Sequence, residues 1–196
     1  MTDPETIRLY NARAQDYANV TEGAGPDATL RAFLAALPPK ARVLDLGCGP
    51  GRSAGILAAA GHQVEAWDAS EGMVALAAKR PGVTARLAEF NSLTASAVYD
   101  AIWANFSLLH APRAEMPRHL AAIRQALKPG GLAHVAVKEG TGSQRDTLGR
   151  LYTYYTEPEL SLLLTQAGLT PGPFRHGEGM GLDKIMAPWI SVTSHA

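Results

Sequence analysis

Short apolar runs alternate with helical segments along most of this sequence, and this order restricts the possible folds more than any other feature. Five such runs occupy residues 42–46, 63–67, 84–88, 100–104 and 132–138. Strands separated by helices are typical of βαβ units, whose crossover helices place the strands parallel in one sheet. Because the 196 residues contain no internal repeat and no linker, the pattern predicts a single α/β domain.

Helix start and stop signals occupy the intervals between these runs. An amphipathic segment that opens at Asp3 is predicted as one helix to about Val20, and a second helix runs from Asp27 to the Pro-Pro pair at 38–39. Four more helices are predicted at residues 52–60, 70–81, 113–127 and 156–168. Two weaker strands are predicted near Phe174 and Trp189.

A glycine-rich turn follows the first predicted strand. Ligands of open parallel sheets bind beyond the carboxyl ends of the strands, where Gly47, Gly49 and Gly51 would let a ligand contact the main chain. A dinucleotide fingerprint requires a third glycine at the position that Arg52 occupies here. Asp45 adds a carboxylate beside the turn, which would repel a diphosphate and attract a cation. The turn is therefore interpreted as the site of a cofactor that carries positive charge.

A second acidic residue ends the next predicted strand. Asp68 lies at the distance along the chain where a carboxylate binds a ribose diol, although an Asp after a strand more commonly caps a turn. Together with Asp45 and the glycine turn, it describes a pocket for a nucleoside with a cationic tail and no phosphate. S-adenosylmethionine matches this description.

Four segments occur in a characteristic order: VLDLGCGPG, VEAWDAS, YDAIWANFSLLHAPR and LKPGGLAHVAVKEG. In this order the chain resembles the class I S-adenosylmethionine-dependent methyltransferases over about two-thirds of its length. The resemblance implies an α/β fold with a Rossmann-like, doubly wound, mostly parallel seven-stranded sheet and helices on both faces. It also implies one methyltransferase domain over residues 1–196, with an N-terminal helical lid at 1–40 and a Rossmann-like core at 41–196.

The same resemblance assigns the cofactor-binding residues position by position. The glycines would approach the methionine part, Asp68 the ribose, and the segment around residue 89 the adenine amino group. The two lid tyrosines would cover the cofactor, or they only pack, since their spacing is helical. The implied residues are Tyr10, Tyr17, Asp45, Gly47, Cys48, Gly49, Gly51, Asp68, Ala69, Met73, Glu89, Phe90 and Asn105.

Methyl transfer from a sulfonium needs little covalent help, so positioning dominates and catalytic residues are hard to identify from motifs. His110 is the only histidine that follows a strand end at the expected active face, and it is the candidate general base. Its imidazole could instead order the turn before the helix that starts at Arg113. Cys48 has no base nearby in sequence and is interpreted as a small buried side chain under the turn.

Composition excludes several function classes. Eighteen basic residues balance eighteen acidic ones, so bulk nucleic-acid binding is not expected. One cysteine and six dispersed histidines predict neither a disulfide nor a metal site, and we expect a soluble cytoplasmic protein without a membrane span. The predicted function is in-line methyl transfer to a small-molecule acceptor by a monomer or homodimer. A non-catalytic S-adenosylmethionine-binding protein and a nicotinamide-dependent oxidoreductase are the alternatives.

Overall fold

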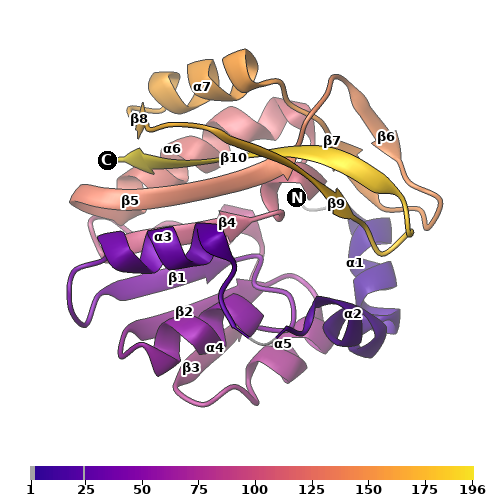
Figure 1. Ribbon diagram of the computed structural model, residues 1–196, viewed down its shortest axis with the longest axis horizontal. Coiled ribbons are helices and arrows are strands. Elements are labelled where there is room, and N and C mark those ends of the chain that lie inside the picture. The colour runs from indigo at the N-terminus through magenta and orange to yellow at the C-terminus, as the bar shows by residue number, and fades with distance from the viewer. Residues whose placement is uncertain (1–2, 24) are drawn as a thin grey trace.

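The computed structural model describes residues 3–23 and 25–196, and a single mixed sheet forms its centre (Figure 1). The strands of this sheet are β1 (Arg42–Leu46), β2 (Gln63–Asp68), β3 (Val83–Leu87), β4 (Tyr99–Asn105), β5 (Leu127–Lys138), β8 (Thr170–Pro171), β9 (Arg175–Met180) and β10 (Met186–His195). Their order is β3-β2-β1-β4-β5-β10-β8, and β9 shares the outer edge of β10 with β8. The sheet thus has seven strand positions.

Strand direction follows the sequence-based expectation. β1 to β5 are parallel to one another, and β10 runs antiparallel to β5. The order reverses at β1, which has β2 on one side and β4 on the other, and such a switch point opens a crevice at the carboxyl ends of the strands. The structure confirms the predicted Rossmann-like, mostly parallel sheet.

Helices cover both faces of this sheet because neighbouring strand residues point to opposite sides. One face carries α3 (Ala28–Ala36), α4 (Arg52–Ala59) and α5 (Glu71–Ala77), and the other carries α6 (Met116–Ala126) and α7 (Glu157–Gln166). In β4, Trp103 packs against Phe33 of α3 with 4.9 Å between ring centroids, while the adjacent Ile102 joins the hydrophobic cluster on the opposite face. The predicted helices on both faces are confirmed.

The N-terminal segment differs from the prediction of one helix to about Val20. It forms α1 (Pro4–Ala12) and α2 (Ala14–Thr21), which are separated at Arg13, where φ is −120° and ψ is 23°. Both helices contact α5, and a Cβ on Gly72 of α5 would lie 3.0 Å from the Ala14 Cβ. A straight helix would carry its second half away from α5, so tertiary packing overrides the local helical pattern.

Three further elements differ from the sequence-based expectation. The helix predicted from residue 113 begins at Met116, after a 3-10 turn at Arg113–Glu115. The predicted turn at 128–131 lies within β5, next to an irregular register between Tyr99 and Ala101. A hairpin of β6 (Ser143–Arg145) and β7 (Leu151–Thr153) occupies a segment in which the sequence predicted no strand. By contrast, β9 and β10 lie where the weaker strands were predicted.

Part of the chain lies at the carboxyl ends of the parallel strands rather than on a sheet face (Figure 1). Figure 1 shows α1, α2 and the β6–β7 hairpin on this side, whereas α3, which the predicted lid also included, packs on a sheet face. We therefore use the term lid for α1 and α2. In the described part of the chain, no helix is both long enough and apolar enough to cross a membrane.

Candidate active site

A cavity of about 310 Å³ lies between the carboxyl ends of β1, β2 and β4 and the lid. This volume falls in the range of small-molecule binding pockets. The cavity collects residues that are far apart in sequence, and most of the predicted site residues line it. These are Tyr10, Tyr17, Asp45, Gly47, Cys48, Gly49, Asp68, Ala69, Met73, Phe90, Asn105 and His110.

The glycine turn after β1 forms the floor of the cavity. Gly47 and Gly49 adopt left-handed φ values of 76° and 53°, and a Cβ on Gly47 would lie 2.3 Å from the Ser107 Cβ. The Gly47 and Cys48 amides both donate to the Trp67 carbonyl oxygen, at 2.7 and 2.9 Å. Neighbouring strands therefore fix the turn, and only glycine fits at position 47.

Two predicted residues lie outside the cavity wall. Gly51, at φ 75°, is the N-cap of α4, and a Cβ there would lie 2.8 Å from both Cα and Cβ of Ala77 in α5. Its role in the structure is to let α4 and α5 pack closely, rather than to leave room for a ligand. Glu89 precedes a 3-10 turn at Phe90–Ser92, and of this pair only Phe90 lines the cavity.

Asp45 is the most unusual group in the cavity. Its side chain is buried, and Oδ2 has no hydrogen-bond partner. Burial raises the pKa of this carboxyl to about 7, helped by the nearby Asp68 and opposed by a hydrogen bond from the Ala54 backbone. A buried carboxylate oxygen without a hydrogen-bond donor is costly, and an ammonium group in the cavity would supply both the donor and the positive charge.

Asp68 both caps the glycine turn and lines the cavity. Its Oδ2 accepts from the Gly49 amide and its Oδ1 from the Ser70 amide, both at 2.9 Å. Burial raises the pKa of Asp68, although these backbone hydrogen bonds oppose the shift. The turn-capping interpretation is therefore confirmed, and the same carboxylate also lines the cavity, where its remaining lone pairs can accept hydroxyl donors.

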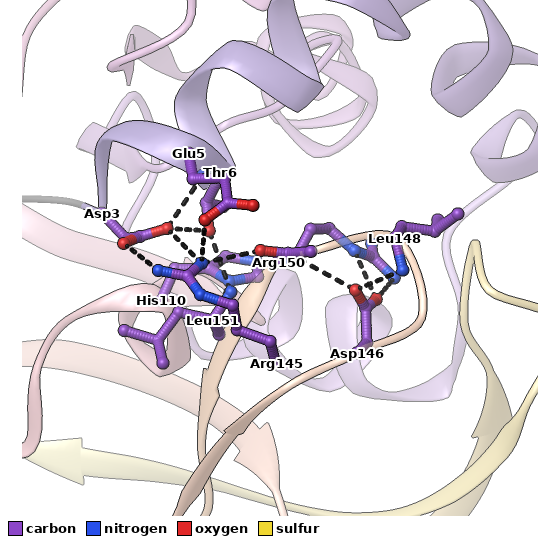
Figure 2. Close-up of polar contacts among 10 residues, drawn as sticks. Asp3, Glu5, Thr6, His110, Arg145, Asp146, Leu148, Arg150 and Leu151 are labelled. Carbon is purple, nitrogen blue, oxygen red and sulfur yellow. Dashed lines mark hydrogen bonds and ion pairs between the residues drawn. The ribbon is translucent and has the colours of Figure 1, made fainter.

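His110 belongs to a buried hydrogen-bond network that connects the lid to the β6–β7 hairpin (Figure 2). Its Nδ1 lies 2.7 Å from the Leu151 carbonyl oxygen and its Nε2 lies 3.0 Å from the Tyr10 hydroxyl. Arg150 donates to the Tyr10 oxygen at 3.2 Å and to Asp146 at 2.8 Å. Burial lowers the pKa of His110 to about 4, so the imidazole is neutral at neutral pH.

The sequence did not identify Arg150 and Asp146 as cofactor-binding or catalytic residues, but it placed them in a polar run, residues 139–155, that would either recognise a polar substrate or form a solvated loop with Arg–Asp pairs. The Arg150–Asp146 pair forms, but both side chains are buried rather than solvated. The available signal was an unusual density of polar-tipped side chains between residues 139 and 155, which are Arg145, Asp146, Arg150, Tyr152, Tyr154 and Tyr155. Their function is visible only once β6 and β7 bring them against α1.

The lid is attached to the rest of the molecule at both of its flanks. On one flank, Arg145 donates to both Asp3 carboxylate oxygens at 2.9 Å, and the Leu151 amide donates to the Thr6 hydroxyl at 2.9 Å (Figure 2). On the other flank, the Asn11 side-chain oxygen accepts from the Ser70 hydroxyl at 2.6 Å. These contacts hold α1 across the cavity.

The remaining expectations for the site concern reactive thiol chemistry and metal binding. Burial raises the pKa of the Cys48 thiol, and this cysteine packs in the turn as expected for a structural side chain. Among residues 3–23 and 25–196, no three His, Cys, Asp or Glu side chains cluster in a way that could hold a metal ion.

A doubly wound sheet with a left-handed glycine turn after β1, an acidic residue closing β2 and a lid over the strand ends defines a class of proteins. This architecture is that of the class I S-adenosylmethionine-dependent methyltransferases, a class whose cofactor is S-adenosylmethionine, and the chain carries a methyltransferase domain. Residues 43–131 match a family model described as a methyltransferase domain.

Individual relatives agree with this class. Trans-aconitate 2-methyltransferase of Methylobacterium nodulans is 36% identical over 108 residues, which cover 53% of this chain and 40% of that protein. The matched part is thus well under half of this curated relative.

Among solved structures, 1,6-didemethyltoxoflavin-N1-methyltransferase of Burkholderia thailandensis, determined with 1,6-didemethyltoxoflavin and S-adenosylhomocysteine, has a TM-score of 0.77 and 26% identity, covering 97% of this chain and 87% of its own. The [4+2]-cyclase SpnF has a TM-score of 0.75 and 20% identity, covering 100% and 97%, and shares the fold.

Proposed function

We propose that this chain transfers the methyl group of S-adenosylmethionine to a small-molecule acceptor. The observation that carries the proposal is the buried Asp45 oxygen without a partner, beside a glycine turn that a Cβ would fill. The methionine ammonium of the cofactor supplies the cation that Asp45 lacks, and Asp68 accepts the ribose hydroxyls. Ala69, Met73 and Phe90 surround the adenine. Gly47 and Gly49 expose main chain to the methionine part.

The bound cofactor supplies an activated methyl group, so the protein contributes positioning, exclusion of water and removal of a proton. In this proposal Asn105, at the end of β4, lies near the methyl donor, and the lid closes the site over it. His110 is the general base candidate, because burial keeps its imidazole unprotonated at neutral pH, the form that can accept a proton.

A small acceptor fits the enclosed geometry better than a macromolecule does. The lid covers the cavity, and Phe106, Ser107 and His110, which follow β4, form part of its wall. Two relatives act on small molecules according to their names, trans-aconitate in one case and a toxoflavin precursor in the other. We infer that the acceptor enters beside Phe106, a residue that is 36% exposed and whose φ of 54° is strained for a non-glycine residue.

The second candidate function is cofactor binding without methyl transfer. SpnF shares this fold but is named a cyclase, so the fold by itself does not establish methyl transfer. A chain that binds the cofactor without transferring its methyl group would retain Asp45 and Asp68 in their present roles. A nicotinamide-dependent activity is less compatible with the site, because the unpartnered Asp45 oxygen would face a diphosphate.

Calorimetry with S-adenosylmethionine and S-adenosylhomocysteine tests cofactor binding, and release of S-adenosylhomocysteine across a panel of small metabolites tests transfer. We expect binding of both molecules and acceptor-dependent release. Binding without release for any acceptor would favour the non-catalytic alternative, and absence of binding would refute the proposal. Asp100→Asn, which alters a carboxylate at the start of β4, is a suitable control for Asp45→Asn.

A further inference from the structure

The hydrogen-bond chain at His110 has a single direction, because the groups at its two ends each have only one role. The Arg150 guanidinium carries donors only, so the Tyr10 oxygen accepts from it. The Leu151 carbonyl oxygen only accepts, so His110 Nδ1 carries the proton of the neutral imidazole. His110 Nε2 is then the unprotonated nitrogen, and the Tyr10 hydroxyl donates to it across 3.0 Å.

The direction of this hydrogen-bond chain limits how His110 can accept a proton. The lone pair of His110 Nε2, which a general base needs, is occupied by the Tyr10 hydroxyl. Both side chains line the cavity, and His110 is only 7% exposed. A proton that leaves an acceptor in the cavity therefore reaches His110 through the Tyr10 oxygen, which retains accepting capacity beside its bond from Arg150.

A buried ion pair holds Tyr10 in this orientation. Arg150 and Asp146 have side-chain exposures of only 2% and 5%, and their Nη2 and Oδ2 atoms are 2.6 Å apart. Burying two charges is costly and does not by itself stabilise a fold. Here the pair directs one guanidinium donor at the Tyr10 oxygen and keeps the hydroxyl proton pointed at His110.

We propose that Tyr10 is a catalytic residue that relays the proton of the methyl acceptor to His110, with Arg150 and Asp146 as positioning residues. The proposal rests on the proposed function. As the acceptor's lone pair forms its bond to the methyl carbon, the C–S bond pair stays with the thioether product. The acceptor proton moves to Tyr10 Oη, and the Tyr10 hydroxyl proton moves to His110 Nε2.

The charge balance of this step suits a buried site. One positive charge leaves the sulfonium as one positive charge appears on the imidazole, so the net charge of the cavity is unchanged. The groups that face His110 are Tyr10 from α1, Lys138 from β5, and Asp146, Arg150 and Tyr152 from the hairpin. Burial and the two nearby cations disfavour a lasting imidazolium, so the proton returns to solvent when the products leave.

Tyr10→Phe tests the relay because it retains the ring and removes only the hydroxyl. We expect the single-turnover rate to fall by about 10²-fold with S-adenosylhomocysteine affinity unchanged, and a two-proton inventory in mixed H₂O and D₂O to become linear. Tyr99→Phe is the matched control, since its hydroxyl binds Glu65 outside the cavity. Unchanged or faster turnover in Tyr10→Phe would show that His110 acts directly and would overturn the relay.

A second measurement does not depend on turnover. Nitrogen-15 NMR of the full chain is expected to show His110 as the Nδ1–H tautomer with a hydrogen-bonded Nε2, and Tyr10→Phe should shift the Nε2 signal toward that of a free lone pair. An Nε2–H tautomer would overturn the relay even in an active enzyme. A wild-type protein that has the expected tautomer but no methyl transfer would instead refute the proposed function.

Discussion

Lowering the pH from 8 to 6 is expected to weaken S-adenosylhomocysteine binding by roughly tenfold, or about 1.4 kcal/mol. The reason is Asp45, whose pKa burial raises to about 7 in the empty cavity. At pH 6 roughly nine-tenths of this carboxyl is protonated, and at pH 8 roughly nine-tenths is ionised. Only the ionised form can pair with the ligand ammonium, so the cost of deprotonation reduces the affinity at the lower pH.

Calorimetry in two buffers of different ionisation enthalpy measures both the affinity and the protons released. We expect close to one proton released per ligand at pH 6 and few at pH 8. His110, with a pKa of about 4, does not titrate in this window. Asp45→Asn should bind more weakly and lose the pH dependence, whereas Asp100→Asn should retain it. A pH-independent affinity in the wild type, or the same slope in Asp45→Asn, would refute the role of Asp45.

Three other perturbations have outcomes that the structure specifies. Gly51→Ala should lose about 1–3 kcal/mol of stability in urea unfolding because its Cβ meets α5, and the loss should exceed that of Gly61→Ala, where the Cβ meets nothing within 4 Å; equal losses would contradict the packing role. Arg145→Ala should change the melting temperature little, since the Arg145 side chain is 42% exposed, but should speed proteolysis of α1 and raise the acceptor KM. Unaltered proteolysis would contradict the anchoring of the lid. Stability should fall as pH decreases from about 6.5 toward 4, because in the unfolded chain three histidines bind protons that they do not bind when buried and neutral in the fold; these are His110, His119 and His134. Asp45 offsets part of this loss between pH 7 and the pKa that its carboxyl has in the unfolded chain, because its folded pKa is raised. Urea midpoints that stay constant over this pH range would contradict the prediction.

Local sequence was sufficient for the elements whose signals are short-range. The apolar run and glycine turn at 42–51 predicted β1 with its observed bounds, and Asp45 and Asp68 were placed at the strand ends before any tertiary information. Each of these features depends on residues within a few positions of one another. Strand period, helix caps and left-handed glycines are properties of the local backbone, so their patterns can be recognised from the sequence alone.

The tertiary structure alone decided how distant segments meet. Position 51 carries a glycine that looks like part of a ligand loop, yet the nearby α5 determines its role. Arg13 interrupts a helical pattern because two short helices must both contact α5. The chain from Asp146 through Arg150 and Tyr10 to His110 joins segments about a hundred residues or more apart. Hydrogen bonds and packing of this kind depend on side-chain directions in the folded state, which no spacing along the sequence encodes.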